Sequence, residues 1–551
     1  MSPRLSALPA WPTETPEPDG GAEDATALSN RPLRLALVFE NAADPPEWGR
    51  RLIEQIRLAP QLELCALISP SMHPPDRVQS RLVRAWLGLE RKFLARPKLA
   101  DSGAFIAACD ALPALPADAE VLIAKQDLDL IVDLSGGQGQ ACRADLARFG
   151  VWFPDFQVNE PALAGLSALL SKKRVADFAL FRRKAGQADP VAIAGGAVNL
   201  KFAASRAGLF MVEKFVPFLM RELKQAHRHG QPNEAVGLEL KPDYRIGLLS
   251  WAEYLASLWA NLGRRGSQKV WAKLGLRPQM FFLKTSACSL DAFDPKSATP
   301  VISRTNSEYA DPFLWESEGE CYCFFEECDF RTGVGHISVG RFEGDELVDI
   351  RPIMRREIHL SFPFLFEDAG ALYMMPETFG AGRLEVWKCA EFPDRWEPYA
   401  TAFEGTYAAD STLTKVGDNW WLFTNISSEP FQDTSSELHI FQVDGPDLGN
   451  PRPHAGNPVI FDSRFARNGG RILEINGELF RVAQENSHGS YGYGLQLMKI
   501  KRLSLEEYEE EPVRRIVPDF EAGIDGCHHL DLRGGRIVMD VRKKFGGFAR
   551  R

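Results

Sequence analysis

The feature that most constrains the fold of this 551-residue chain is a repeated unit of two strands joined by a glycine-containing turn. The first copy, ADPFLWESEGECYCFFEE, runs from Ala310 to Glu327, and four more follow at Pro363–Glu377, Ser411–Asn425, Gly469–Glu485 and His529–Asp540. The copies begin about 50 to 60 residues apart, and self-similarity at that period is typical of β-propeller blades. The repeat therefore predicts an all-β five-bladed propeller over residues 280–545.

Composition indicates a globular chain with more than one domain. Hydrophobic residues make up 45% of the sequence and charged residues 25%, and the length exceeds what a single hydrophobic core usually serves. The formal net charge of −10 argues against a general nucleic-acid binder, which needs a basic surface to neutralise phosphates. We therefore expect no nucleic-acid partner.

Cysteine usage and the lack of long apolar runs favour a cytoplasmic protein. The nine cysteines are scattered, and an odd number fits reduced thiols better than a disulfide framework. Cys321 and Cys323 point the same way from one strand without a second Cys/His pair nearby, so we expect no metal site. The N-terminus shows no signal peptide, and no later run has the roughly 18 uncharged residues of a membrane span.

The N-terminal half changes pattern twice. Residues 1–31 are rich in Pro, Glu, Asp, Ala and Ser, which predicts a disordered tail. From Leu33 onward, strand and helix patterns alternate, which predicts a Rossmann-like α/β domain with a parallel sheet over residues 32–230. Residues 231–279 contain a linker and a helix with a basic end. We favour a helix packed between two domains, with association at a membrane surface as the alternative.

One loop of the α/β domain is a possible anion site. Ser135–Gly139 follows a predicted strand and precedes a predicted helical segment, Ala141–Gly150. The N-terminus of a helix after a glycine-rich loop suits a nucleotide phosphate. The loop lacks full GxGxxG spacing, so an ordinary strand-to-helix turn is the alternative.

The same half resembles the formyltransferase fold that is used on transfer RNA and nucleotide sugars. The resemblance rests on the glycine loop, the segment FGVWFPDF from Phe149 to Phe156, a strand pair around Phe178–Val198 and a helix over Ser205–His227. That family is expected to use an Asn and a His that precedes a Pro.

The catalytic imidazole of that family has no counterpart here. Phe153-Pro154 stands at the position of the His-Pro pair, and Asp189 alone, as a counterpart of the family's Asp, cannot handle the protons. We expect a degenerate scaffold, with N-formyl transfer to an amino sugar as an alternative activity.

Polar residues at the ends of the repeated strands should converge on the propeller channel although they are far apart in sequence. Asp311, Ser361 and Asp410 stand at the start of the first strand in the first three blades. The other predicted substrate-binding residues lie at the entry to the first strand of the last two blades or at the end of a second strand: Glu327, Asn425, Arg467, Gln484, Glu485, His528 and His529. Tyr491 is a candidate for stacking on a sugar ring.

Glycoside chemistry needs two carboxyl groups at the anomeric carbon, one as acid and one as base or nucleophile. Asp311, Glu377 and Asp410 are the residues that we predict to supply them.

The C-terminal half, over about residues 280–545, resembles the propeller domain at the N-terminus of plant glucosamine inositolphosphorylceramide transferases. Its markers are Pro376-Glu377 after the second blade, the run Ala483–Asn486 with a following Tyr-Gly, and His528–Asp531. More distantly it is similar to five-bladed glycoside hydrolases and glycan phosphorylases, through Asp311-Pro312-Phe313. That similarity implies Asp311 as base, Glu377 as acid and Asp410 as the residue that tunes them.

These patterns predict a carbohydrate-active protein that transfers or cleaves glycosyl groups on a sugar nucleotide, a glycolipid or a surface-polysaccharide intermediate. We expect no cofactor other than a possible sugar-nucleotide donor. In the plant proteins the transfer chemistry is attributed to a separate C-terminal domain outside this sequence. The alternative is therefore a non-catalytic glycan-binding module that works with a partner transferase.

Overall fold

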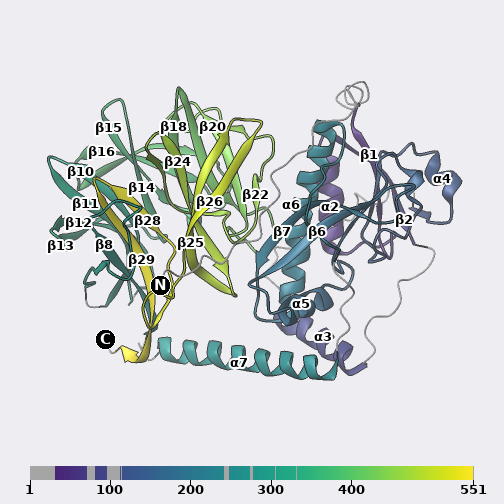
Figure 1. The fold of residues 1–551 in the computed structure, drawn as a ribbon, viewed down its shortest axis with the longest axis horizontal. Coiled ribbons are helices and arrows are strands. Elements are labelled where there is room, and N and C mark those ends of the chain that lie inside the picture. Colours follow the sequence, from purple (N-terminus) through teal and green to yellow (C-terminus); the bar gives the residue numbers. More distant parts are fainter. Residues whose placement is uncertain are drawn as a thin grey trace. The chain divides into compact units, whose positions relative to one another are not determined.

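The structure is a computed structural model that describes residues 31–70, 81–95, 112, 114–240, 247–273, 277–304, 306–330 and 332–549. The chain forms two compact units whose main boundary falls between Tyr254 and Leu255 (Figure 1). The predicted N-terminal tail lies outside the described residues, apart from Arg31. Among the described residues, no helix combines the length and the apolar composition that crossing a membrane requires.

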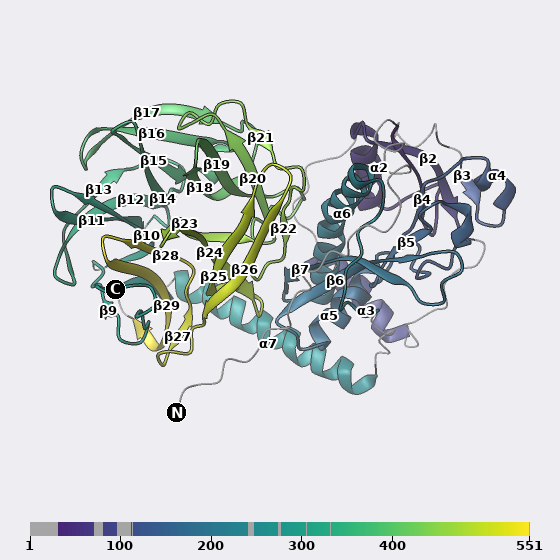
Figure 2. The same cartoon turned by 45° about the horizontal axis from the view of Figure 1, so that its top comes forward.

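The first unit contains a seven-stranded sheet in the order β3-β2-β1-β4-β5-β6-β7 (Figure 2). Its strands are β1 (Leu33–Val38), β2 (Leu62–Ser69), β3 (Ala114–Pro116), β4 (Leu130–Asp133), β5 (Val151–Pro154), β6 (Val175–Arg183) and β7 (Val191–Asn199). Strands β1 to β5 pair in parallel, whereas β6 pairs antiparallel with β5. The sheet is therefore mixed, and the prediction of a parallel sheet is correct only for β1 to β5.

Helices separate most of these strands, as the alternating pattern predicts. They are α2 (Glu47–Leu58), α3 (Arg81–Leu94), α4 (Glu120–Ala124), α5 (Pro161–Leu170) and α6 (Ala204–His229). Helices α5 and α6 cross closely because both have glycine at the contact. A Cβ at Gly208 would lie 1.5 Å from the carbonyl oxygen of Pro161. The formyltransferase-like assignment of this unit stays a prediction.

The predicted helix over Ala141–Gly150 is wrong, because only a short 3-10 helix, η2 (Ala144–Leu146), forms there. The backbone of the following residues pairs with the segment before β4. The amides of Arg148 and Phe149 donate to the carbonyl oxygens of Leu128 and Asp129. Those bonds require an extended chain at the point where a helix would have continued.

Helix α7 (Leu248–Lys273) forms where the sequence predicts a helix. Tyr254 and Leu258 are buried on one side, whereas Trp259 is 61% exposed. Both the packed-helix interpretation and the membrane-surface alternative stay predictions.

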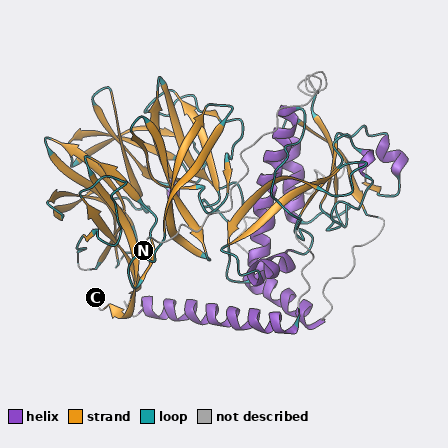
Figure 3. Ribbon diagram, in the orientation of Figure 1, coloured by secondary structure: helices purple, strands orange, loops and turns teal. Residues whose placement is uncertain are grey.

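The second unit is the predicted five-bladed β-propeller, whose blades are five antiparallel sheets (Figure 3). The first two blades are β10 (Ser307–Ser317), β11 (Glu320–Asp329), β12 (Gly335–Glu343) and β13 (Glu346–Met354), then β14 (Ser361–Asp368), β15 (Ala371–Glu377), β16 (Leu384–Glu391) and β17 (Arg395–Ala402). The next two are β18 (Ala408–Val416), β19 (Asn419–Ile426), β20 (Glu437–Val443), β21 (Arg452–Pro453) and β22 (Ile460–Phe461), then β23 (Arg467–Ile475), β24 (Glu478–Ser487), β25 (Ser490–Leu503) and β26 (Tyr508–Ile516).

The fifth blade closes the ring by combining early and late strands. It consists of β8 (Arg277–Ser286), β9 (Thr299–Pro300), β27 (Ile524–Gly526), β28 (Leu530–Arg533) and β29 (Arg536–Ala549). Strand β8 pairs antiparallel with β29, so the first and last long strands of the propeller lie in one blade. Such closure removes the exposed strand edges that an open sheet would leave.

Candidate active site

A pocket of about 250 Å³ lies at the end of the channel where the inner strands begin. Every blade contributes to its lining, which consists of Phe281, Glu308, Ala310, Asp311, Glu326, Cys328, His359, Ser361, Glu377, Asp410, Arg467, Tyr491 and His528. The structure thus brings together the three predicted catalytic carboxyl residues, as well as Ser361, Arg467, Tyr491 and His528. Convergence of the repeated strand ends on one point was the basis of that prediction.

A bulge at the start of the inner strands positions two of the acids. In the first three blades the register with the second strand shifts between Ala310 and Phe313, Ser361 and Phe364, and Ala409 and Thr412. Asp311 and Asp410 sit in these bulges with φ of 50° and 45°, in the left-handed region that non-glycine residues seldom adopt.

The corresponding residue of the second blade is Phe362, with φ of 47°. Ser361 pairs with Glu377 one residue earlier, so Ser361 is in the pocket but is not the counterpart of the two aspartates. The sequence alignment of blade starts was wrong by one residue there, because a bulge leaves no mark in the hydrophobic pattern.

Arg467 joins two of the predicted catalytic acids. Its Nε donates to Asp410 Oδ2 at 2.6 Å, and its Nη2 lies 3.6 Å from Glu377 Oε2. The backbone amide of Asp410 donates to Glu377 Oε2 at 3.2 Å. Burial raises the pKa of Glu377 well above its usual value, the charge of Asp410 raises it further, and the Arg467 guanidinium opposes the shift.

His528 occupies the same kind of position between two other acids. Its Nδ1 lies 2.6 Å from Asp540 Oδ2, and its Nε2 lies 3.5 Å from Asp311 Oδ1. Burial lowers the pKa of His528, but Asp540 and Asp311 together raise it to about 9. Burial also raises the pKa of Asp311 well above its usual value, and the positive charge of His528 opposes that shift.

Glu377 and Asp311 therefore differ in the sign of their strongest neighbouring charge. The largest such effect on the pKa of Glu377 comes from the carboxylate of Asp410, and the largest on Asp311 comes from the imidazolium of His528. Burial raises the pKa of both groups, so the neighbouring charge is what separates them: it raises the pKa of Glu377 further and lowers that of Asp311, which is the kind of difference that an acid and base pair requires. Chemically, the arrangement suits Glu377 as proton donor and Asp311 as proton acceptor.

Asp311, His528 and Asp540 also have ligand atoms within 4.8 Å of one another, a spacing that would admit a metal ion. Both oxygens of Asp540 already accept backbone N–H groups, however: Oδ1 from His528 and His529, and Oδ2 from Asp311. These bonds favour a hydrogen-bonded cluster over a ligand set. The expectation of no metal stays a prediction.

Beneath the pocket, an ion pair that sequence reasoning missed crosses the channel. Arg471 on β23 forms a two-point contact with Asp531 on β28. Arg471 also donates to the carbonyl oxygens of Leu314 on β10 and Leu365 on β14, at 3.1 and 3.2 Å. A side chain that reaches the inner strands of three other blades must cross the channel axis, so the pocket has a closed floor.

Tyr491 stands at the opposite, open side of the pocket and is 43% exposed. The Arg467 guanidinium lies 5.1 Å from the centre of its ring, and the ring of His528 lies 5.4 Å away, edge-on. The ring of Phe281 also packs against the ring of His528, with the two centres 4.6 Å apart. The ring of Tyr491 is thereby fixed, as a sugar-stacking surface requires.

Five predicted substrate-binding residues lie outside the pocket lining, and two of them, Glu327 and Asn425, make hydrogen bonds within the propeller framework. Glu327 accepts a hydrogen bond from Ser338 Oγ at 2.7 Å. Burial raises the pKa of Glu327, but hydrogen bonds from His336 and Ser338 outweigh that effect and lower the pKa to about 2. Asn425 donates to the carbonyl oxygens of Glu437 and Ala466. Both arrangements are structural, and a substrate-binding role for these residues stays a prediction.

The other three are also buried. Gln484 donates to the carbonyl oxygen of His528 at 3.4 Å, and Glu485 pairs with Arg515 at 2.7 Å. His529 packs edge-on against the rings of Phe313 and Phe362, and burial lowers its pKa to about 4, which keeps it neutral. Their positions outside the lining follow from strand register, which the sequence pattern does not specify.

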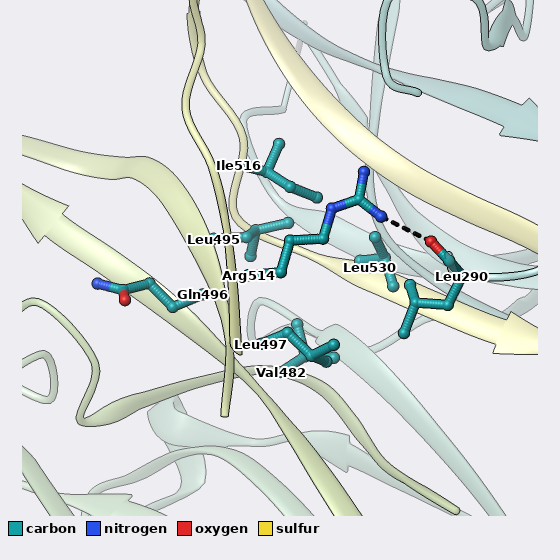
Figure 4. A pocket seen from close by; sticks show the side chains of 8 residues that line it. All are labelled: Leu290, Val482, Leu495, Gln496, Leu497, Arg514, Ile516 and Leu530. Carbon is teal, nitrogen blue, oxygen red and sulfur yellow. Dashed lines mark hydrogen bonds between the residues drawn. The ribbon is translucent and has the colours of Figure 1, made fainter. Parts of the chain in front are cut away.

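A second, much smaller pocket of about 20 Å³ lies among strands of the last two blades (Figure 4). Its walls are mainly apolar, from Val482, Leu495, Leu497, Ile516 and Leu530. Arg514 at its edge donates to the carbonyl oxygen of Leu290 at 2.6 Å. A space of that size holds about one water molecule, so it is not a substrate site.

The glycine loop of the first unit is occupied by a carboxylate of the chain itself. The backbone amides of Ser135 and Gly139 donate to the two oxygens of Asp133 at 3.0 and 2.9 Å, and Ser135 Oγ donates at 2.6 Å. These donors are the ones that a phosphate would have used. The arrangement favours the ordinary-turn interpretation, and Asp189 is exposed in a separate loop.

Solved structures similar to this chain include several carbohydrate-active enzymes. The match with a family 117 glycoside hydrolase from Zobellia galactanivorans covers 48% of this chain and 91% of the hydrolase chain, with 9% identity and a TM-score of 0.32. The match with the catalytic domain of an α-L-arabinofuranosidase from Coprinopsis cinerea covers 49% of this chain and 98% of that domain, with 12% identity and a TM-score of 0.32.

Similarity in sequence points to one family of plant proteins. The family model described as glucosamine inositolphosphorylceramide transferase 1, N-terminal, matches residues 297–533. The transferase of that name from rice (japonica) is 32% identical over 258 residues, which cover 44% of this chain, and the one from Arabidopsis thaliana is 33% identical over 233 residues, which cover 41%. The matches span only 34% and 30% of those relatives. The propeller half of this chain is thus similar to the N-terminal region of the plant glucosamine inositolphosphorylceramide transferases.

Proposed function

We propose that the propeller is the catalytic domain of a carbohydrate-active protein, and that it acts on a glycosidic or activated glycosyl bond. The observation that carries this proposal is the pair Glu377 and Asp311. Both carboxyl groups are held in one pocket by different blades and have raised pKa values, with neighbouring charges of opposite sign. Two carboxyl groups with such separate roles are what glycosyl chemistry needs.

In the proposed step, Glu377 gives its proton to the leaving oxygen as the bond between that oxygen and the anomeric carbon breaks. A water molecule, or a hydroxyl of an acceptor, forms the new bond to the anomeric carbon and passes its proton to Asp311. Asp410 raises the pKa of Glu377, so it keeps the acid protonated before the step. Arg467 holds Asp410 in place for that task.

Similarity to proteins named as glucosamine inositolphosphorylceramide transferases supports a glycolipid, a sugar nucleotide or a surface-polysaccharide intermediate as substrate. The matched region is about a third of those proteins, so cooperation with a partner transferase is part of the proposal. We place this activity in the cytoplasm, on the basis of the cysteine content.

The test uses the full chain and the variants Glu377→Gln and Asp311→Asn on a panel of glycosides and activated sugars. Loss of a general acid or base typically lowers turnover by about 10²- to 10⁴-fold. Glu318→Gln, in the exposed turn of the first blade, is the matched control and should behave like the unmodified protein. Unchanged turnover in both pocket variants would refute the assignment. Saturable sugar binding without turnover, retained in both variants, would favour a glycan-binding module.

A further inference from the structure

A largely apolar patch with two aromatic rings adjoins the pocket on the side of Glu377. It consists of Ile358, Phe379 and Tyr407, which we call the rim patch. Ile358 precedes His359 of the pocket, Phe379 follows Glu377 by two residues, and Tyr407 precedes Asp410 by three. In each blade the inner strand begins and the second strand ends at the same end of the channel, as the pairing of Ser361 with Glu377 shows. The three residues therefore share the face on which the pocket lies.

The loop that carries Phe379 lies close to both Ile358 and Tyr407. The rings of Phe379 and Tyr407 are 5.2 Å apart at an angle of 43°. A Cβ on Gly380 would lie 3.4 Å from Ile358, and one on Gly382 would lie 3.8 Å from the ring of Tyr407. Tyr407 is nevertheless 43% exposed, so much of its ring remains free to meet a ligand.

The loop that carries Phe379 is held in its conformation by its own hydrogen bonds. The hydroxyl of Thr378 donates to the carbonyl oxygen of Arg383 at 2.7 Å. The amides of Ala381 and Gly382 donate to the carbonyl oxygens of Thr378 and Phe379 at 2.8 and 3.0 Å. Because the loop is already ordered, a ligand that stacks there loses little affinity to ordering it.

We propose that the rim patch binds the sugar unit on the leaving-group side of the scissile bond, so that the protein takes substrates of at least two sugar units. This inference rests on the proposed function, in which Glu377 protonates the leaving oxygen. A group bonded to that oxygen must lie beside Glu377, and Phe379 is two residues away.

The closed floor adds a second, independent reason. Arg471 and Asp531 cross the channel below the pocket, so a glycan whose terminal unit enters the pocket can leave only over the rim. Arg383, which directly precedes β16, pairs with Glu385 on that strand at 3.0 Å, so a charged group follows the loop in the chain. An apolar ring face with polar groups at its edge suits a pyranose, which has apolar faces and a rim of hydroxyls.

The experiment measures binding without turnover, in the Glu377→Gln background of the full chain. The probes are matched pairs of a methyl monosaccharide and the corresponding disaccharide, for glucose, galactose, xylose and N-acetylglucosamine, studied by calorimetry. Stacking on one ring is worth about 0.5–1.5 kcal/mol, and about 1.4 kcal/mol corresponds to a factor of ten. Tyr407→Ala should therefore weaken binding of the disaccharide up to about tenfold and leave monosaccharide binding unchanged.

Two further variants separate stacking from general damage. Tyr407→Phe keeps the ring and should retain the affinity for the disaccharide. Tyr399→Ala removes a tyrosine that is equally exposed, at 45%, but lies on the outer strand β17, and should have no effect.

An affinity difference between disaccharide and monosaccharide that persists in Tyr407→Ala would overturn the inference while leaving the proposed function intact. Failure of every sugar to bind the Glu377→Gln protein would overturn both.

Discussion

Removing the positive charge of Arg467 should show how far one buried ion pair supports the pocket. The substitution Arg467→Met keeps most of the side-chain volume but leaves Asp410 without its partner at 2.6 Å. Asp410 is only 4% exposed, so little water reaches its carboxylate to replace the guanidinium. Breaking a buried pair by removing one partner typically costs about 3–5 kcal/mol, because the remaining charge is uncompensated. We expect Arg467→Met to lose stability in that range at pH 7.

A surface pair of the same geometry provides the control. Arg351 Nε also lies 2.6 Å from a carboxylate, that of Asp394, but the two side chains are 39% and 53% exposed. Exposed pairs contribute only about 0–1 kcal/mol, so Arg351→Met should have little effect. The double variant Arg467→Met with Asp410→Asn removes both charges and should be more stable than Arg467→Met alone.

Stability should be followed in the propeller itself, because a chain of two units need not unfold in one step. Hydrogen exchange of peptides covering β18 and β23 during denaturant titration reports on the strands that carry the pair. A loss below about 1 kcal/mol for Arg467→Met, or equal losses for Arg467→Met and Arg351→Met, would show that burial does not govern this pair.

Three further predictions follow from other contacts. His528→Gln removes the positive charge that holds down the pKa of Asp311, so the acidic limb of the profile of kcat/KM against pH should move to higher pH; a limb that stays in place would contradict the assignment of Asp311 as base. The pKa of Glu327 is lowered from 4.5 to about 2, so its stabilisation is complete above pH 4.5 and disappears as the pH falls through 2. In the variant Glu327→Gln, the free energy of unfolding should therefore fall less steeply as the pH drops from 4.5 to 2, and the difference should reach about 3 kcal/mol at most. Equal dependence of thermal unfolding on pH in the variant and the unmodified protein would disprove this prediction. Arg471→Met should leave the buried charge of Asp531 without a partner and lower the free energy of unfolding by about 3–5 kcal/mol, measured by thermal unfolding. Arg471→Lys should lose less stability because the positive charge remains.

The propeller could be predicted because each blade repeats the same local signal. A strand, a glycine turn and a second strand recur in sequence, and a propeller turns that repetition into rotation about one channel. Equivalent strand ends must then meet, which is why the repeat alone was enough to group Asp311, Glu377 and Asp410. Pairing of β8 with β29 was also predictable, because a ring needs its first and last strands together.

What could not be predicted depends on pairings and shapes that leave no local pattern. The bulges at Asp311 and Asp410 shift the register by one residue, and this is why Phe362, and not Ser361, is their counterpart in the second blade. The floor formed by Arg471 and Asp531 joins residues 60 positions apart, and neither lies in an unusual sequence context. In the first unit, an amide of the glycine loop donates to the carboxylate of Asp133, although the glycine spacing of the loop resembles that of an anion site.

The two cations of the pocket explain why proton transfer should fall to Glu377 and Asp311. Arg467 lies 2.6 Å from Asp410 but 3.6 Å from Glu377, and His528 lies 2.6 Å from Asp540 but 3.5 Å from Asp311. Each cation thus binds one acid tightly and faces a second acid loosely. Protonating a tightly bound acid would break a short buried ion pair, which costs several kcal/mol.

Protonating Glu377 or Asp311 breaks no such pair, and burial favours their neutral forms. The loosely held acids are therefore the two that can exchange a proton without disturbing the fold around them. Substitution of Asp540 should accordingly act first on structure and on the charge of His528, and only through that cation on catalysis. Substitution of Asp410 should disturb its pair with Arg467 in the same way and, in addition, lower the pKa of Glu377.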